Sequence, residues 1–438
     1  MTLTATTILS RPFLTRILRP VAQRRTQRPL LYASQRQFSS LASDDSSSAE
    51  EEVDAVWSKM DAKSRRLAKL LLDSDDPHDM ASEDAPDEAT RRLRENHIFN
   101  RRRGLSQAIT LIESSHADHQ KQSNLLLTYL LGHENNHNRK DRSFRLGIAG
   151  SPGAGKSTFV EAFGKHLLNL PKDDNPDADS HEQCNKVAVV CVDPSSAVTG
   201  GSILGDKTRM MELSRHERAY VRPSPTRNVL GGLSAYTEDV VSLCQVAGYD
   251  FVMLETVGLG QSEIEVKESV DMLILMVPPG GGDDLQGIKK GIVEVCDMIV
   301  VTKADGNFLV AAKHTAADYR GALRMMGPRR AGLGSTLEGW ETPPVLLASS
   351  YDNTGMDDVW GEICRFRNLM MESGKLQEKR QKQTKYWMWK NLQNLILEQT
   401  RTDHVLRQKA ETLERDLREG KTTPRVAATE LLDSLVRT

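Results

Sequence analysis

Short apolar runs alternate with helix-sized amphipathic segments through the middle of the chain. The runs are rich in Val, Ile and Leu, which is typical of strands buried on both faces of a parallel sheet. Six of them predict strands, at residues 144–149, 186–192, 250–254, 271–277, 297–301 and 345–348. Strands separated by helices predict an α/β fold built on a doubly wound, mainly parallel sheet, whose ligands bind at the carboxyl ends of the strands.

Helical periodicity also extends beyond this region on both sides. It covers residues 53–72 and 91–131 ahead of the first strand, and it returns from about residue 360 to the end. We therefore expect helical N-terminal and C-terminal extensions. In the last one, Trp387, Trp389 and the leucines that follow form a broad apolar face. This face could pack on its own domain, but its length and aromatic content favour a dimer contact.

A glycine-rich loop follows the first predicted strand. It contains the complete pattern G-x-x-x-x-G-K-[ST] and consists of Gly150, Ser151, Pro152, Gly153, Ala154, Gly155, Lys156, Ser157 and Thr158. The glycines let backbone N–H groups approach a phosphate at the start of the next helix. Lys156 can then pair with the β- and γ-phosphates, and the Ser157 hydroxyl suits Mg²⁺. Because a strand precedes the loop and an amphipathic helix follows it, the loop predicts nucleotide binding rather than an ordinary turn.

The segments after two further predicted strands indicate which base the nucleotide carries. Thr302-Lys-Ala-Asp305 follows the fifth predicted strand, where guanine-binding proteins carry N-K-x-D. The Asp305 carboxylate can accept two hydrogen bonds from guanine that adenine does not offer, and the Lys303 stem would lie along the base. Thr302 replaces the usual Asn, and its hydroxyl could tie this segment to the phosphate loop; alternatively, Asp305 only caps a helix. A last base contact, from a backbone N–H to guanine O6, is expected after the sixth strand, at Ser349, Ser350 and Tyr351.

Carboxylates at other strand ends predict a magnesium site. Asp193 ends the second predicted strand, and Asp206 closes the polar, glycine-rich segment after it. The two could bind Mg²⁺ directly or through its waters, although one of them could be only a helix cap. Glu255 begins E-T-V-G in the slot of D-x-x-G. It could order an attacking or metal-bound water, and Gly258 could sense the γ-phosphate through its N–H.

The run at residues 280–291 is the most unusual in the chain, because three glycines are followed by acids and lysines. It predicts a further nucleotide-sensitive loop. An extra loop of this kind suits a protein that reports its nucleotide state to a partner.

The first 43 residues differ sharply from the rest. They contain seven arginines, many Ser and Thr and no Asp or Glu, whereas acidic residues begin at Asp44. This composition is typical of a mitochondrial transit peptide and predicts a matrix location; the alternative is a disordered basic tail. The net charge of −2 gives no reason to expect nucleic acid. The five cysteines show no C-x-x-C spacing, and no apolar run reaches the roughly 18 residues of a membrane span.

These features divide the chain into five expected parts. They are a transit peptide (1–43), an acidic, partly disordered linker (44–90), a helical N-terminal arm (91–142), a P-loop GTPase domain (143–358) and a helical C-terminal dimerisation arm (359–438).

The motifs together resemble those of the MeaB/ArgK family of G proteins. The string T-G-G-S-I-L-G-D-K-T-R-M at 199–210 is more specific than the phosphate loop, and the similarity covers roughly residues 90–438. The resemblance implies a homodimeric GTPase that acts as a metallochaperone-like G protein. Such a protein gates adenosylcobalamin delivery from an adenosyltransferase to methylmalonyl-CoA mutase and protects the mutase.

The resemblance also assigns residues. It implies that GTP is held by 150–158, Asp305 and 349–351, and that four residues surround Mg²⁺: Ser157, Asp193, Asp206 and Glu255. Lys156 would act on the phosphates, and three residues are candidates for coupling the 280–291 loop to the site: Glu255, Asp283 and Lys289.

The expected reaction is in-line attack of water on the γ-phosphate, with Lys156, the loop amides and Mg²⁺ stabilising the developing charge. Two alternatives stay open. One is a kinase that phosphorylates an amino acid or another small molecule with the same loop; it would need an acceptor pocket with a general base. The other is a G protein that delivers a metal ion, which would call for a Cys/His cluster. We expect neither nucleic acid nor a membrane as a partner.

Overall fold

The structure is a computed structural model that describes residues 46–72, 88–114, 116–136, 143–170, 184–194, 210–226, 236–256, 262–280, 290–327 and 337–437. The chain divides into two compact units, residues 1–55 and 56–438, and nearly all described residues belong to the second. The expected transit peptide lies outside the described residues. None of the helices in the described part combines the length and the apolar character of a membrane span.

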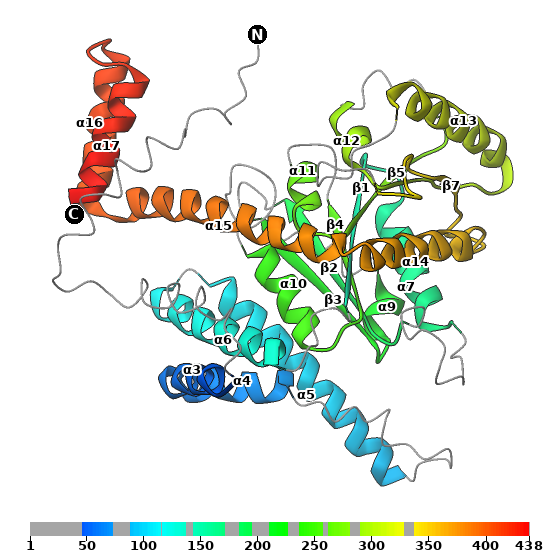
Figure 1. The fold of residues 1–438 in the computed structure, drawn as a ribbon, viewed down its shortest axis with the longest axis horizontal. Coiled ribbons are helices and arrows are strands. Elements are labelled where there is room, and N and C mark those ends of the chain that lie inside the picture. The colour runs from blue at the N-terminus through cyan, green and yellow to red at the C-terminus, as the bar shows by residue number, and fades with distance from the viewer. Residues whose placement is uncertain are drawn as a thin grey trace. The chain divides into compact units, whose positions relative to one another are not determined.

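A seven-stranded parallel sheet forms the centre of the second unit (Figure 1). In spatial order its strands are β3 (Ala219–Thr226), β2 (Val187–Pro194), β4 (Phe251–Thr256), β1 (Phe144–Gly150), β5 (Met272–Val277), β6 (Met298–Val301) and β7 (Val345–Leu347). Every neighbouring pair is parallel. The expected doubly wound α/β fold is confirmed. The strand order reverses beside β1, which places the loop after β1 at a topological switch point, where ligands bind in such sheets.

Strand β3 is the one strand that hydrophobic patterning does not predict. It contains Pro223 and Pro225, and proline cannot donate the N–H that a central strand needs. In the described sheet β3 is an edge strand paired with β2, in a register that sets Pro223 opposite Cys191 and Pro225 opposite Asp193. Because the prolines are two residues apart, their missing donors fall on one side of the strand, and an edge strand can leave that side unpaired.

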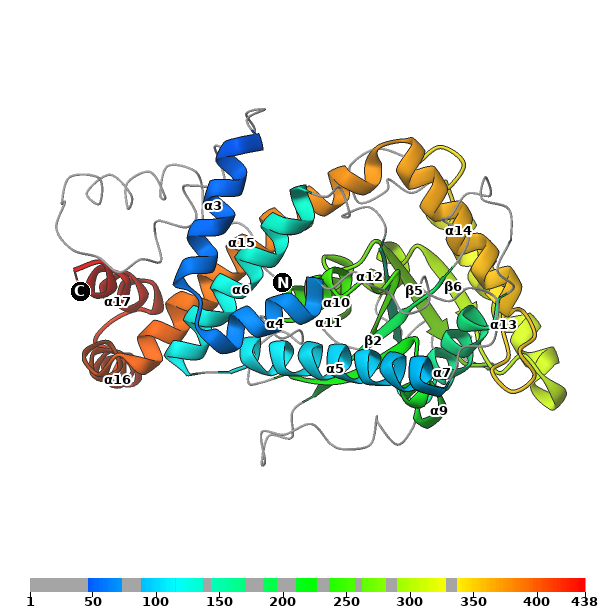
Figure 2. The same ribbon diagram turned by 90° about the horizontal axis from the view of Figure 1, so that it is seen from below.

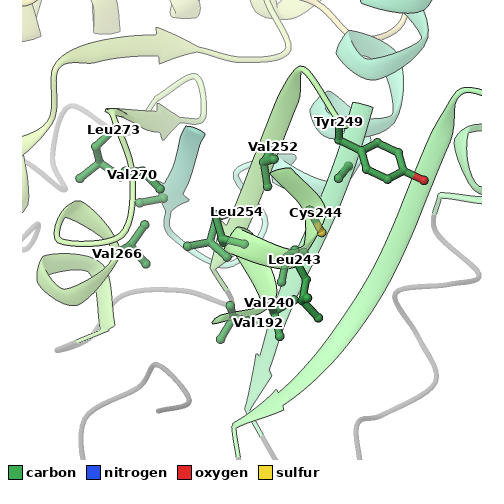
Figure 3. Packing of buried hydrophobic residues seen from close by; sticks show 14 of the residues in the cluster. Val192, Val240, Leu243, Cys244, Tyr249, Val252, Leu254, Val266, Val270 and Leu273 are labelled. Atoms are coloured by element: carbon green, nitrogen blue, oxygen red, sulfur yellow. The ribbon is translucent and has the colours of Figure 1, made fainter. Parts of the chain in front are cut away.

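Side chains of the strands alternate between two buried clusters, one on each face of the sheet. On β4, Val252 and Leu254 belong to the first cluster, and Phe251 and Met253 belong to the second. Figure 3 shows part of the first cluster, where helix α10 (Thr237–Val246) lies against β2 and β4. Because both faces are buried, the central strands appear in the sequence as continuous apolar runs.

Helices cover both faces of the sheet. The first cluster receives side chains from α10, α11 (Ser262–Lys267), α12 (Lys290–Val295) and α13 (Leu309–Met326). The second receives them from α7 (Lys156–Leu168), α9 (Met211–Arg215) and α14 (Met356–Glu372). A short 3-10 helix, η5 (Gly306–Phe308), precedes α13.

Further helices lie on both sides of the sheet region in the sequence, as expected (Figure 2). The N-terminal ones are α3 (Ser46–Lys59), which crosses the division between the two units, α4 (Ala62–Leu72), α5 (Glu88–Ile112) and α6 (Ala117–Asn136). Helices α4, α5 and α6 pack on one another, and α5 and α6 also contact α10. The C-terminal ones are α15 (Lys375–Thr402), α16 (His404–Arg418) and α17 (Pro424–Arg437). The boundaries of the five expected parts stay predictions.

A buried ion pair attaches α15 to the sheet. Arg380 donates from Nε and Nη2 to the two carboxylate oxygens of Asp271, at 2.9 and 2.7 Å, directly before β5. Burial alone would raise the pKa of Asp271, which is fully buried. The charge and hydrogen bonds of Arg380 and the charge of Arg145 outweigh that effect and hold the pKa below its ordinary value. The two-point geometry makes this a strong and orientation-specific contact.

Candidate nucleotide-binding site

Loops behind four strands meet at the carboxyl edge of the sheet. The loop after β1 continues into α7, and residues of both contact the ends of β4 and β6. The segment after β7 in turn contacts the segment after β6. The structure therefore brings together the phosphate loop, Glu255, the segment 302–305 and Ser349, which the sequence placed in separate motifs.

The phosphate loop depends on a glycine at its start. Gly150 has φ 153°, and a Cβ atom there would lie 2.3 Å from the carbonyl oxygen of Met276 in the neighbouring strand β5. Any other residue would have to push β1 and β5 apart at this point. The loop then turns into α7, which begins at Lys156. Unpaired backbone N–H groups at the start of a helix form a ready site for an anion.

The Lys156 side chain folds over the loop that precedes it. Its Nζ donates to the carbonyl oxygens of Gly150 and Ser151, at 2.7 and 3.0 Å, and the residue is buried. An ammonium held in this way adds a full positive charge to the partial charge of the helix start. The arrangement can attract the phosphates of a nucleotide.

Ser157 and Glu255 meet beside the loop. The Ser157 hydroxyl donates to Oε1 of Glu255 at 2.6 Å, and Glu255 lies buried near the end of β4. The pair sets a hydroxyl and a carboxylate oxygen side by side, and Mg²⁺ prefers ligands of both kinds. Among the described residues, no group of three or more His, Cys, Asp or Glu could hold a metal ion.

Several expected site residues lie outside the described part of the chain. They are Asp206, Gly258, Asp283 and Lys289, together with the side chain of Asp193. The backbone of Asp193 belongs to β2, and it lies near the carboxyl end of that strand, as the sequence indicated. The expected nucleotide-sensitive loop, 280–291, is described only at its two ends.

The segment after β6 is tied directly to the phosphate loop. Thr302, which is buried, donates from Oγ1 to the carbonyl oxygen of Ala154 at 2.7 Å. This is the tie expected of its hydroxyl. Lys303 adopts a left-handed conformation, with φ 53°, and its Nζ donates to the carbonyl oxygen of Gly153 at 3.1 Å. The Lys303 side chain therefore crosses from the expected base-binding segment to the loop.

Asp305 is oriented by a serine from another strand end. The hydroxyl of Ser349, which is fully buried, donates to Oδ2 of Asp305 at 2.6 Å. Asp305 makes no side-chain capping bond to η5, which follows it. The alternative of a helix cap is therefore wrong for this carboxylate. One oxygen of the carboxylate is held by Ser349, and that bond sets the direction of the group.

Sequence reasoning missed this role of the Ser349 side chain, because it assigned only a backbone N–H to the segment. The hydroxyl also accepts a hydrogen bond from the backbone N–H of Tyr351 at 3.2 Å, whereas the Tyr351 side chain is 91% exposed. The turn continues at Asp352. The backbone N–H of Thr354 donates to that carboxylate at 3.0 Å, and the hydrogen bonds from Thr354 hold the pKa of Asp352 below its ordinary value. The position of Ser349 in the sequence did hold a signal for this role. Ser349 follows β7, and β7 pairs with β6, the strand that precedes Asp305.

Comparison with known proteins places the chain in a family. The family described as "Methylmalonyl Co-A mutase-associated GTPase MeaB" matches residues 105–405. The chain is 41% identical over 345 residues to "Methylmalonic aciduria type A homolog, mitochondrial" of Mus musculus, covering 78% of each protein. It is 42% identical over 341 residues to the Caenorhabditis elegans protein of the same name, covering 77% of this chain and 79% of that one.

Bacterial relatives and a solved structure agree with this. Identity to the GTPase ArgK of Escherichia coli is 44% over 313 residues, covering 71% of this chain and 84% of that protein. The crystal structure of a LAO/AO transport system kinase is similar at a TM-score of 0.55 and 32% identity, covering 81% of this chain and all of that one. The family match spans most of the chain and includes the phosphate loop and Asp305. The chain therefore belongs to the MeaB family of methylmalonyl-CoA mutase-associated GTPases, and it is a guanine-nucleotide-binding GTP hydrolase.

Proposed function

We propose that this GTPase works in the mitochondrial matrix, where it gates adenosylcobalamin delivery to methylmalonyl-CoA mutase and protects the mutase. The observation that carries the nucleotide-binding part of this proposal is the direct tie between the expected base-binding segment and the phosphate loop, from Thr302 to Ala154 and from Lys303 to Gly153. Contacts with base and phosphates are thereby linked within one unit. The mutase-associated family and the relatives named mitochondrial support the partner and the compartment.

GTP is bound across the strand ends. The residues 150–158 hold the phosphates, Asp305 and Lys303 hold the guanine, and the turn 349–351 completes the base contact. The buried Ser349 hydroxyl supports this assignment, because a carboxylate that is already oriented pays less entropy when it binds guanine. Gly258 is assigned to the γ-phosphate.

Ser157, Asp193, Asp206 and Glu255 would hold Mg²⁺, directly or through its waters. The fit rests on the pair of Ser157 and Glu255, whose oxygens lie 2.6 Å apart beside the phosphate loop. When bound, the ion would neutralise charge on the phosphates. The protein's own part is to keep Ser157 at the start of α7 and Glu255 at the end of β4.

Hydrolysis is attack of water on the γ-phosphate. Lys156 and the N–H groups at the start of α7 stabilise the charge that develops on the phosphate oxygens. Glu255 orders water, and Asp283 and Lys289 couple the 280–291 loop to the reaction. With no arginine finger assigned, turnover by the isolated protein is slow and depends on the partner.

The molecule is a homodimer joined by its C-terminal arm, and an adenosyltransferase supplies the cofactor that it passes on. Support for the dimer comes from α15, where apolar side chains stay exposed on the described surface: Met388, Trp389, Leu392, Leu395 and Leu397. The division into transit peptide, linker, N-terminal arm, GTPase domain and C-terminal arm is part of the same proposal.

The experiment that tests this function measures GTP turnover and GTP affinity with and without purified methylmalonyl-CoA mutase. We expect the mutase to change the rate, the affinity or both, with an unrelated cobalamin-independent enzyme as the control. Identical values in the presence and absence of the mutase would contradict the chaperone role. That result would leave the assignment of the protein as a GTP hydrolase unchanged.

The kinase alternative is tested in the same reaction. A hydrolase releases the γ-phosphate as inorganic phosphate in amounts equal to GDP, even when amino acids are present. A kinase would leave a matching shortfall of inorganic phosphate and a phosphorylated acceptor. We expect no shortfall. The metal-delivery alternative predicts instead that a transition metal changes turnover more than the mutase does.

A further inference from the structure

Side chains of helix α15 contact the end of α11, the short helix that follows the segment assigned to the γ-phosphate. Only residues 257–261 separate α11 from the end of β4, which carries Glu255. Three side chains of α15 contact α11 or the turn behind it: Gln383, Trp387 and Lys390. They are spaced four and three residues apart, so they lie on one face of the helix.

Gln383 is the most completely buried of the three residues. Its Nε2 donates to the carbonyl oxygens of Lys267 and Val270, at 3.0 and 2.7 Å, and the residue is 1% exposed. Both N–H bonds of the amide are used, whereas its Oε1 is buried and accepts no hydrogen bond from any described residue. A buried acceptor without a donor is unfavourable. The amide is therefore explained by the two hydrogen bonds that its nitrogen donates. One of them holds Lys267, the last residue of α11.

Trp387 and Lys390 extend the contact along the same face. The indole N–H of Trp387 donates to the carbonyl oxygen of Glu268 at 2.7 Å, and the ring is buried. Lys390 Nζ donates to Oε1 of Glu265, a buried carboxylate of α11, at 2.9 Å. The helix and the turn after it are thus held by a pair of amide hydrogen bonds, an indole and an ion pair, all from one element.

A valine of α11 and one from the turn after it rest on β1, the strand that leads into the phosphate loop. Val266 and Val270 lie beside Leu273 in the first buried cluster (Figure 3). A Cβ atom at Gly147 of β1 would lie 2.9 Å from a methyl group of each valine, so only glycine allows this approach. Helix α11 is therefore enclosed between β1 and α15. It cannot move far at one contact without disturbing the other.

We propose that Gln383, Trp387 and Lys390 are positioning residues of the GTPase, which set the position of α11 and link the bound nucleotide to helix α15. The inference rests on the proposed function in one respect, the assignment of Gly258 to the γ-phosphate. If GTP and GDP favour different positions of α11, the contacts of α11 with α15 differ between the two states. By linkage, a change on α15 must then alter the relative affinity for the two nucleotides.

Two substitutions with matched controls test the link in the full chain. Gln383→Glu replaces the donating nitrogen with an acceptor that faces two carbonyl oxygens. Gln381→Glu makes the same change at an exposed position of the same helix. Lys390→Met keeps an unbranched side chain one atom shorter and removes the ion pair, and Lys385→Met is its exposed control.

The measured quantity is the ratio of the dissociation constants for GDP and for a non-hydrolysable GTP analogue, together with kcat and KM. We expect Gln383→Glu and Lys390→Met to change this ratio by roughly two- to thirty-fold, the range of ordinary coupling between sites. The controls should stay within about twofold, which is too small to count as coupling by the same measure. A purely structural role would lower the melting temperature of both variants and leave the ratio at its wild-type value.

Fluorescence of the wild-type protein supplies a second readout, with Trp387→Phe as the spectral reference. Trp387 is buried against Glu268, so its emission should differ between the GDP and analogue complexes. Subtracting the spectra of Trp387→Phe isolates that difference from the other tryptophans. A wild-type nucleotide ratio in Lys390→Met, with no Trp387 difference signal, would overturn the proposal even if Gln383→Glu failed to fold. Wild-type protein that binds neither nucleotide would instead overturn the proposed function itself.

Discussion

At the scale of single residues, the proposed recognition of guanine depends on one carboxylate and the hydroxyl that orients it. Asp305 lies four residues beyond the end of β6 and has an extended backbone conformation, and Ser349 from the neighbouring strand end holds one of its carboxylate oxygens. A carboxylate that gives up water on binding and gains no donor in return is unfavourable, so a base without matching N–H groups is expected to bind weakly. Selectivity is therefore expected to depend on Asp305 far more than on the exposed Tyr351 side chain.

Asp305→Asn should move the preference from GTP to xanthosine triphosphate. The amide presents an N–H where guanine also presents N–H groups, whereas xanthine presents an oxygen there. We expect GTP affinity to fall by about a hundredfold. Competition binding with GTP and XTP measures the change, and Asp358→Asn, an exposed carboxylate of α14, is the control. Unchanged selectivity for GTP would remove Asp305 from its assigned role.

At the scale of elements, the site depends on hydrogen bonds that join segments following different strands. The Thr302 hydroxyl joins the segment after β6 to the phosphate loop after β1, although 148 residues separate Thr302 from Ala154. Strand β5 lies between these two strands, and its Met276 carbonyl oxygen excludes a side chain at Gly150. The geometry of the phosphate loop is thus determined by three strands together.

Thr302→Val should weaken both the fold and the site. The substitution keeps the branched shape but removes the donor, and it leaves the Ala154 carbonyl oxygen short of a partner. We expect a loss of about 1–3 kcal/mol in unfolding free energy and several-fold weaker GTP binding. Urea unfolding and nucleotide titration measure the two effects. Thr302→Ser should restore both, because it returns the hydroxyl; equal behaviour of Val and Ser would contradict the tie.

Asp239, in the first turn of α10, predicts an unusual pH dependence. Burial and the nearby charge of Glu238 raise its pKa to about 7. Its pKa in the unfolded chain is about 3.9, so between these values the folded protein holds a proton that the unfolded chain has lost. The stability owed to this group is therefore present at acid pH and is lost as the pH rises toward 7.

Asp239→Asn should accordingly stabilise the protein above pH 7 by roughly 1–4 kcal/mol and change little near pH 4. Melting temperatures of the two proteins between pH 4 and 8 measure this. A constant difference across the whole range would contradict the raised pKa. Asp358→Asn, at an exposed position, should show no such trend.

At the scale of the whole molecule, α15 has two different halves. Its first half attaches to the sheet through buried polar contacts such as Arg380 with Asp271. Its second half leaves large apolar side chains exposed, although the sequence shows one continuous helix. The apolar face expected on this helix packs within the chain only in part. Trp387 is buried, whereas Trp389 is 40% exposed.

Leu395→Glu should weaken the proposed dimer. Leu395 is 61% exposed, so the charge costs little in a single chain, but it would be buried against apolar side chains in a dimer contact. We expect light scattering on a size-exclusion column to shift from twice the 48.8 kDa chain mass toward that mass. Leu93→Glu, at a position of α5 that is 71% exposed, is the control. An unchanged mass would contradict a dimer formed through this part of α15.

The sequence by itself determined the phosphate loop, six of the seven described strands and the helical extensions. These features are local, because spacing along the chain reports burial on both faces of a strand or on one face of a helix. It did not reveal β3, since two prolines mask a strand that only an edge position permits.

Only the tertiary structure decided which distant residues serve one another. Ser349 orients Asp305 across 44 residues, and Arg380 holds Asp271 across 109. Such pairs depend on which strands are neighbours in the sheet and on where a long helix crosses it, and neither is written in local periodicity. The sequence motifs thus identified the chemical groups of the site, and the order of the strands in the sheet decided how those groups are oriented.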